Sequence, residues 1–340
     1  MAYPRVRSSN PEAAVYHCMT RTVNKERLFD DVAKEMLRKH LGQAAEFSGV
    51  QILTYALLSN HFHVLLRVPD RATAEAGTTD AELIRRYRVL YPKPTRFRPA
   101  QICVLEETLS RGGDDAQRLR RSLLARMHDV SEFMKTVKQR FSVWFNRTHQ
   151  RYGTLWAERF RSTLVEAGRG TALLTMAAYI DLNAVRAGLV SDPKDYRFCG
   201  YGEAVAGGER ARPGLTAIVV SLDQLQTRQV SAPWKSVAAA YRQTLFGKGS
   251  APREHAGTLD SGAAQTVMRR RGALSAAEVL RCRLRAFTDG AVLGSRVFVL
   301  EHLAAYRART GRRRLLGPQP LRLAADASDL FALRGCPTIV

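Results

Sequence analysis

The chain lacks the features of an extracellular or membrane protein. Its five cysteines are scattered and odd in number, and no two form a CxxC pair, which argues against a disulfide framework or a cysteine zinc site. The first ten residues contain no apolar core of a signal peptide, and no apolar run approaches the ~20 residues that a transmembrane helix needs. We therefore expect reduced thiols, a cytoplasmic location and no membrane-spanning segment.

Acidic residues are scarce. The 340 residues include 31 Asp and Glu against 53 Lys and Arg, a net charge of +22, while 45% of the residues are hydrophobic. An apolar content this ordinary argues against disorder, and a positive excess this large predicts a polyanionic partner, either nucleic acid or an anionic membrane surface. Residues 231–340 carry half of the excess, with 18 basic and 7 acidic side chains, so we expect two regions to share the binding surface.

Apolar periodicity predicts an alternation of strands and helices. The expected elements are a strand over 14–20, a helix over 28–47, a hairpin of 50–58 and 61–67 around Ser59-Asn60, a helical zone over 119–145, an extended segment over 154–165, and a helix over 171–187 that ends at Gly188. Residues 70–100 are mixed and rich in turn residues, which indicates an insertion.

This order predicts an α+β fold. The β-α-β-β-α-β series is typical of a ferredoxin- or RRM-like antiparallel sheet with helices on one face. The composition shifts at Pro213, and helices are expected over 275–287, opened by the capping pattern Ser275 to Glu278, and over 295–309, capped by Ser295. We therefore predict a domain over 1–212, with an insertion at about 70–118, and a basic, mainly helical C-terminal domain over 213–340. Two interpretations of this second domain stay open, a helix-turn-helix-like contact with DNA and a helical scaffold with a charged surface.

Two side-chain pairs are candidates for chemistry. His61 and His63 are two residues apart on a predicted strand and so share a face, where two neutral imidazoles make half of a divalent metal site. Tyr179 and Asn183 share a face of a predicted helix, and a phenol serves as a nucleophile on a phosphodiester when a metal draws charge from the phosphate. Taken singly, each pair also fits an ordinary strand or an amphipathic helix, whereas together they suggest a metal site with its nucleophile.

The chain resembles the single-tyrosine HUH nucleases and, more narrowly, the REP-associated tyrosine transposases. The segments that carry the likeness cover about residues 10–205 and occur in the family's order. They are Tyr16-His17-Cys18 with Thr20-Arg21, Leu58 to His63, Lys138 to Arg140 with Phe145-Asn146, Leu155-Trp156 with Arg159-Phe160, and Tyr179 to Gly188. Ala184 departs from the family, which usually has Pro at that place.

The resemblance implies an activity and its residues. His61 and His63 would bind a divalent metal, Mg or Mn, with Asn183 as a third, amide-type ligand. Tyr179 would be the nucleophile that forms a 5′-phosphotyrosine and frees a 3′-hydroxyl. The substrate would be single-stranded, hairpin-forming DNA of the repetitive extragenic palindrome (REP) type, and the protein would act in the bacterial cytoplasm at the nucleoid, as a monomer or a homodimer. With DNA as the polyanionic partner, no membrane partner is expected.

Basic residues interleaved with aromatic ones are typical of surfaces that bind single-stranded nucleic acid. The predicted DNA contacts are Lys135, Lys138, Arg140, Arg147, Arg151, Arg159, Arg161, Arg312, Arg313 and Arg314.

Two other classes of function stay open. One is a non-catalytic DNA- or RNA-binding regulator on the same fold. The other is an RNA-binding module, although the chain lacks an RNP1-type aromatic run and such a module leaves the histidine pair unexplained.

Overall fold

A computed structural model describes residues 6, 8, 13–92, 101–168, 171–223, 233–246, 280, 287–288, 290–311, 317–321 and 330–333. A seven-stranded sheet runs through the described part of the chain. Its strands, in spatial order, are β2 (Gln51–Leu57), β3 (His61–Val68), β1 (Ala14–Arg21), β4 (Arg161–Val165), β5 (Val292–Gly294), β7 (Phe331–Leu333) and β6 (Gln319–Pro320). All neighbouring strands are antiparallel except β4 and β5, which confirms an α+β fold on a mostly antiparallel sheet.

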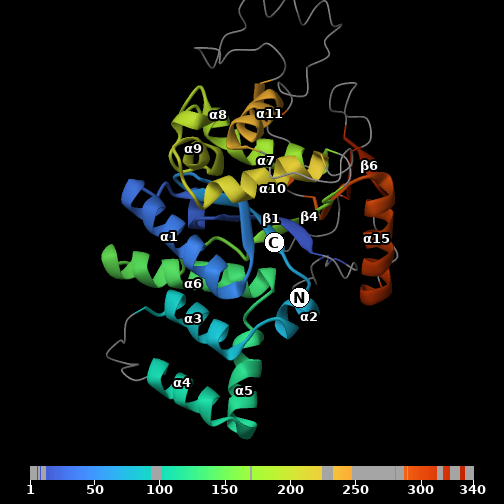
Figure 1. The fold of residues 1–340 in the computed structure, drawn as a ribbon. Coiled ribbons are helices and arrows are strands. Elements are labelled where there is room, and N and C mark those ends of the chain that lie inside the picture. The colour runs from blue at the N-terminus through green and yellow to red at the C-terminus, as the bar shows by residue number, and fades with distance from the viewer. Residues whose placement is uncertain are drawn as a thin grey trace, which may run out of the picture.

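Helices cover both faces of the sheet, so the expectation of helices on one face is wrong (Figure 1). One face carries α1 (Asp31–Ser48) and α6 (Val130–Thr148), and the other carries α7 (Ala172–Asp181), α9 (Gly200–Val205) and α10 (Ala211–Asp223), with α11 (Trp234–Phe246) packed on α7 and α10. Neighbouring residues of β3 show the division, because Phe62 packs against Trp156 beside α6 while His63 packs against Tyr179 of α7. The central strands are apolar on both sides, which is the pattern expected of strands that are buried on both faces.

The C-terminal region adds strands to this sheet, where a mainly helical region was expected. Strand β5 pairs with β4, and β7 and β6 follow it. The helix expected over 295–309 is confirmed as α15 (Arg296–Thr310), which Ser295 caps by accepting a hydrogen bond from the Phe298 N–H at 3.2 Å. The helix expected over 275–287 lies outside the described residues apart from Leu280 and Phe287. The proposed boundary at residue 213 falls within α10.

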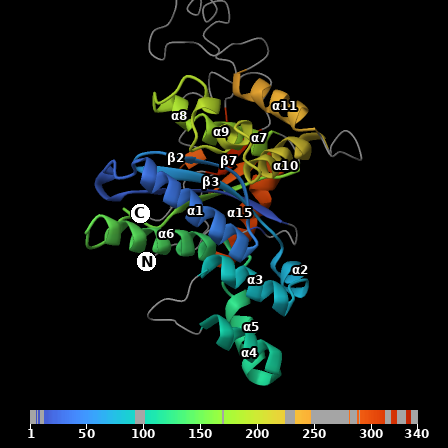
Figure 2. The same ribbon diagram turned by 60° about the vertical axis from the view of Figure 1, so that its left-hand side comes forward.

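The insertion is helical, not turn-like. It comprises α2 (Arg71–Ala76), α3 (Asp80–Leu90), α4 (Gln101–Arg111) and α5 (Gly113–Leu124). Leu83, Tyr87 and Leu90 recur at helical spacing and form a second apolar core, to which α1 contributes Phe47. Figure 2 shows this helical group at one end of the molecule, next to α1 and away from α7 to α11.

Helix α10 covers the edge strand β2. Gly214 makes the approach possible, because a Cβ at that position would lie 2.4 Å from the Leu53 carbonyl oxygen. Covering an edge strand in this way protects its unpaired backbone groups from pairing with another chain.

The predicted hairpin and first helix are confirmed within a few residues. Asp30 caps α1 by accepting a hydrogen bond from the Ala33 N–H at 2.7 Å, and Gly49 ends the helix in a left-handed conformation, with φ of 67°. The helix expected over 171–187 is divided, since α7 ends at Asp181 and the short α8 (Asn183–Arg186) follows. Of the extended segment over 154–165, only the last five residues form a strand.

Candidate active site

The histidine pair projects from β3 toward α7. His61 and His63 lie opposite Arg21 and Met19 of β1 in the strand register. Their ring centroids are 5.2 Å apart and their planes are nearly perpendicular, at 77°. His63 is buried, whereas His61 is half-buried, so the pair reaches from the interior toward the surface at the end of the hairpin.

A third histidine, which the sequence analysis did not assign to the site, lies directly beside this pair. His17 of β1 stacks on His63 with ring centroids 5.1 Å apart, and its Nε2 lies 2.8 Å from Nδ1 of His63. On its other side, Nδ1 of His17 lies 3.0 Å from the carbonyl oxygen of Phe287. The sequence predicts a strand over 14–20, which contains His17, but the register that sets this strand beside β3 could not be read from the sequence.

Burial keeps both inner imidazoles neutral. It lowers the pKa of His17 to about 4. Burial also lowers the pKa of His63 well below its ordinary value, and the neighbouring His17 and His61 lower it further. A neutral imidazole is the form that binds a metal, so the donor chemistry of this cluster fits a divalent cation.

Tyr179 contacts the same cluster from α7. Its ring lies perpendicular to that of His63, with centroids 6.3 Å apart, and packs on Phe287 at 4.7 Å. The structure therefore brings together the tyrosine and one histidine of the predicted site. Tyr179 is only 2% exposed.

Arg186, another residue that the predicted site omitted, covers the tyrosine. Its guanidinium carbon lies 4.0 Å from the centroid of the Tyr179 ring. The same group donates hydrogen bonds to the carbonyl oxygens of Tyr179, at 2.5 Å, and Leu280, at 2.7 Å. A positive charge therefore lies over the phenol, and the arginine also holds the break between α7 and α8.

The amide nitrogen of Asn183, at the start of α8, is engaged with the end of α7. That nitrogen donates to the carbonyl oxygens of Tyr179, at 3.3 Å, and Ile180, at 3.1 Å. Its carbonyl oxygen is the group that a metal would require. Among the residues that the structure describes, no group of three or more His, Cys, Asp and Glu side chains is arranged to hold a metal, so a cation here would depend on an amide oxygen or on the substrate for its further ligands.

A buried carboxylate anchors the tyrosine helix. Asp181, two residues after Tyr179, accepts hydrogen bonds from the Thr54 hydroxyl at 2.9 Å, the Tyr201 N–H at 3.1 Å and the Tyr241 hydroxyl at 2.5 Å. Burial raises the pKa of Asp181 to about 6, although these donors oppose that change. The network ties α7 to β2, α9 and α11, which fixes the position of the tyrosine.

Three of the predicted DNA contacts line one pocket. Lys135, Lys138 and Arg159 surround a pocket of about 500 Å³ whose wall includes Trp156 and Phe160. Arg159 is exposed, Lys135 pairs with Glu132 at 3.2 Å, and the Lys138 ammonium donates to the carbonyl oxygen of Glu158 at 2.7 Å. The residues before Arg159 run beside the end of β1, where Thr22 and Trp156 form a bridge.

The other predicted DNA contacts are dispersed. Arg147 is exposed, Arg151 pairs with Glu26 at 3.3 Å, and Arg161 pairs with Glu158 at 2.8 Å. Arg140 lies 5.5 Å from the centroid of Tyr91 in the insertion, and burial lowers its pKa, which indicates a packing role. Arg312, Arg313 and Arg314 lie outside the described residues.

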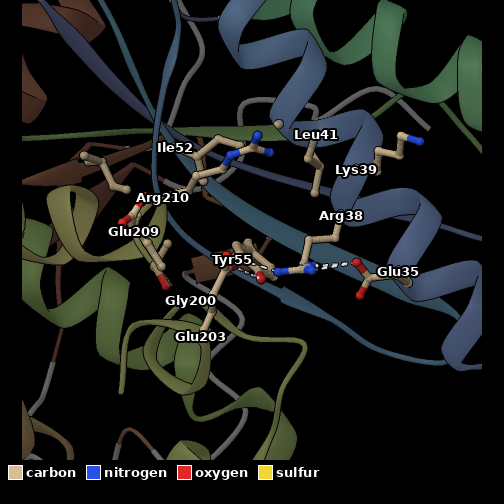
Figure 3. Close-up of a pocket in the computed structure, with 14 residues that line it drawn as sticks. Glu35, Arg38, Lys39, Leu41, Ile52, Tyr55, Gly200, Glu203, Glu209 and Arg210 are labelled. Carbon is tan, nitrogen blue, oxygen red and sulfur yellow. Dashed lines mark hydrogen bonds and ion pairs between the residues drawn. The ribbon is translucent and has the colours of Figure 1, made fainter. Parts of the chain in front are cut away.

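A second pocket, of about 450 Å³, lies at the edge strand β2 between α1, α9 and α10 (Figure 3). Three of its charged side chains pair with one another, since Arg38 binds Glu35 at 2.6 Å and Glu203 at 3.1 Å. The Tyr55 hydroxyl donates to the same Glu203. These contacts join α1, β2 and α9, so these three charges contribute to holding the fold.

Comparisons with known proteins agree with the sequence pattern. The protein family described as "Transposase IS200 like" matches residues 12–76, which span β1 to α2 and include His17, His61 and His63. Among solved structures, the chain is similar to a REP-associated tyrosine transposase bound to a REP hairpin, with 16% identity and a TM-score of 0.38 over 61% of this chain and 87% of that one. No curated protein matches the chain.

No helix in the described ranges is long and apolar enough to cross a membrane. Residues 12–76, which contain β1, α1 and the β2–β3 hairpin, are thus similar to the IS200-like transposase domain.

Proposed function

We propose that the chain is a metal-dependent endonuclease and strand transferase that cuts single-stranded, hairpin-forming palindromic DNA with Tyr179 as its nucleophile. The observation that supports this proposal is the contact between the Tyr179 ring and His63, which joins helix α7 to the histidine pair of β3. Side chains with the chemistry of a nucleophile and of metal ligands thus meet from two separate segments. The IS200-like domain over residues 12–76 supports the same assignment.

The reaction follows from the chemistry of these groups. The Tyr179 oxygen attacks the phosphorus, the bond from phosphorus to the 3′ oxygen breaks, and the departing 3′ oxygen takes up a proton to become a hydroxyl. The 5′ end stays on the protein as a phosphotyrosine, and the phenolic proton passes to solvent or a base. A divalent cation, Mg or Mn, held by His61, His63 and Asn183 would neutralise charge on the scissile phosphate.

Arg186 supports the nucleophile. A neutral phenol with a pKa near ~10 is a weak nucleophile, and attack requires negative charge to develop on its oxygen. The Arg186 guanidinium, 4.0 Å from the ring centroid, favours that charge by electrostatic attraction.

The basic pocket next to the end of β1 is the proposed DNA contact. Lys135, Lys138 and Arg159 lie there beside Phe160, a combination that suits phosphate contacts together with base stacking. Arg147, Arg151 and Arg161 lie outside this pocket and are proposed as further, separate contacts with the DNA. The solved relative was captured with a REP hairpin, and we propose a hairpin of this kind as the substrate, bound by a monomer or a homodimer. We also retain residues 213–340 as a region that contributes to DNA binding.

One experiment tests the assignment. Labelled single-stranded DNA that carries a hairpin is incubated with the protein and Mn²⁺ or Mg²⁺, and denaturing gels are read for cleavage and for a protein–DNA adduct. We expect a metal-dependent adduct from the native chain and none from Tyr179→Phe. Cleavage that persists in Tyr179→Phe would show that the nucleophile is a different residue.

A non-catalytic DNA-binding regulator is the second candidate. The observation that favours it is the burial of Tyr179 and His63, each only 2% exposed, because in the cleavage reaction a phosphodiester must reach Tyr179 and a metal ion must reach His63. Binding of the hairpin that is tight and sensitive to salt, with no adduct in either metal, would select this function.

A further inference from the structure

We propose that His17 is a positioning residue, which fixes the tautomer of His63 so that Nε2 of His63 is the nitrogen offered to the metal. The metal part of this inference rests on the proposed function, whereas the tautomer can be observed without metal or DNA. His17 itself would touch neither the cation nor the substrate.

The hydrogen bonds determine where each proton lies. The carbonyl oxygen of Phe287, 3.0 Å from Nδ1 of His17, can only accept, so Nδ1 of His17 carries the proton. In a neutral imidazole the other nitrogen, Nε2, then accepts. It lies 2.8 Å from Nδ1 of His63, so Nδ1 of His63 carries the proton and donates it. The lone pair of His63 is thereby left on Nε2.

Burial stabilises this pair of tautomers, with a proton on Nδ1 of each histidine, over the alternatives. His17 and His63 are each only 2% exposed, so water cannot easily replace either hydrogen bond. If His63 carried its proton on Nε2 instead, two nitrogen lone pairs would face each other at 2.8 Å in the protein interior. An unsatisfied buried polar group of this kind is unfavourable, so the carbonyl of Phe287 sets the state of His63 through His17.

The tautomer of His61 is set in the same way, by Asn60. Its Nδ1 lies 2.7 Å from Oδ1 of Asn60, and the orientation of that amide is fixed because its nitrogen donates to the Lys25 carbonyl oxygen at 2.9 Å. Nδ1 of His61 therefore donates, and its lone pair also lies on Nε2. Both histidines of the pair thus have the same tautomer, each imposed by an acceptor at Nδ1.

This tautomer matters because a metal binds an imidazole only at its unprotonated nitrogen, and the hydrogen bond at the other nitrogen selects which one that is. Loss of such an outer partner typically lowers metal affinity 10–100-fold. The effect acts on metal binding before any DNA is present.

The test uses a matched pair of variants, His17→Gln and His17→Leu. A glutamine carries an amide oxygen that can accept from Nδ1 of His63, whereas a leucine of similar size cannot. In the full-length protein, free of metal and DNA, long-range ¹⁵N–¹H spectra of labelled histidines report the protonated nitrogen of His63, with His63→Gln used only to assign its signals. Mn²⁺ affinity is then measured by electron paramagnetic resonance, and circular dichroism confirms that each variant is folded.

We expect the native chain and His17→Gln to hold the His63 proton on Nδ1 and to bind Mn²⁺ within about threefold of each other. We expect His17→Leu to show His63 protonated on Nε2 or in a mixture, and to bind Mn²⁺ about 10–100-fold more weakly. A native spectrum with the proton on Nε2 of His63 would overturn the inference without reference to any variant. Equal Mn²⁺ affinity in the leucine and glutamine variants would overturn it as well. Failure of Tyr179 as the nucleophile would change neither result, so the two proposals fail separately.

Discussion

Removal of one hydroxyl from the network around Asp181 should weaken the fold in a manner that depends on pH. Tyr241 of α11 donates to Oδ2 of Asp181 at 2.5 Å, and both side chains are fully buried. The change Tyr241→Phe removes this donor and little else. The remaining donors to the carboxylate are the Thr54 hydroxyl and the Tyr201 N–H.

The size of the effect follows from the charge of Asp181. Its pKa is raised by burial from 3.8 to about 6, so the folded state binds a proton more tightly than the unfolded state between pH 4 and 6. Stability contributed by the protonated carboxyl is therefore lost as pH rises through this range, by about 3 kcal/mol at about 1.4 kcal/mol per pH unit. At pH 8 the carboxylate is charged and depends most on its donors.

A hydrogen bond to a charged group contributes about 1.5–3 kcal/mol, and one between neutral groups about 0.5–1.5 kcal/mol. We thus expect Tyr241→Phe to lower the free energy of unfolding by about 1.5–3 kcal/mol at pH 8 and by about 1 kcal/mol at pH 5. Urea unfolding followed by circular dichroism at both pH values measures the difference. The exposed Tyr152 provides a control, since Tyr152→Phe should change stability by less than about 0.5 kcal/mol. An equal loss of unfolding free energy at pH 5 and pH 8 would show that the Tyr241 hydrogen bond does not depend on the charge of Asp181.

Three further predictions concern packing, DNA and metal. Gly214→Ala should destabilise the protein by about 1–3 kcal/mol in thermal unfolding, because its Cβ would meet the Leu53 carbonyl. Gly77→Ala, whose Cβ has no heavy atom closer than 3.7 Å, is the control and should have little effect. Equal losses of stability in the two variants would contradict this prediction. Arg159→Ala should lower the slope of log affinity for single-stranded DNA against log salt by about 0.7, and an unchanged slope would remove Arg159 from the interface. His61→Gln and His63→Gln should each reduce Mn²⁺-dependent cleavage at least ~100-fold while the fold is kept, and full activity of either variant would exclude that residue as a ligand.

Local patterns predicted the elements that position the site. The β-hairpin with His61 and His63 two residues apart, and the helix that carries Tyr179, follow from alternation and helical spacing in short windows of sequence. The structure places His63 against Tyr179, as expected when two such segments pack face to face. The assignment of roles to these residues remains a prediction.

What the sequence could not provide was long-range pairing. The contact of His17 with His63 depends on the register of β1 against β3. The hydrogen bond of Arg186 depends on the carbonyl oxygen of Leu280, which lies 94 residues away in the chain. The second layer of helices was missed although the near-continuous apolar runs of β2 and β3 are typical of strands that are covered on both faces. The helical insertion was missed because the turn residues that start α3, such as Thr79, also serve as helix caps.

Strands at the end of the chain were missed for a related reason. Strand β5 has three residues and β6 only two, too short for alternation to be recognised. They form strands because β4 offers an edge for pairing.

The covalent link between Tyr179 and DNA can be tested directly by locating the nucleotide on the protein. The native protein is incubated with a hairpin-bearing single strand and Mn²⁺, the adduct is digested with a protease and a nuclease, and the nucleotide-bearing peptide is sequenced by mass spectrometry. We predict a 5′-phosphate linked to Tyr179, in the peptide that follows Arg169. A nucleotide found on any other residue, or cleaved DNA without a linked peptide, would contradict the account.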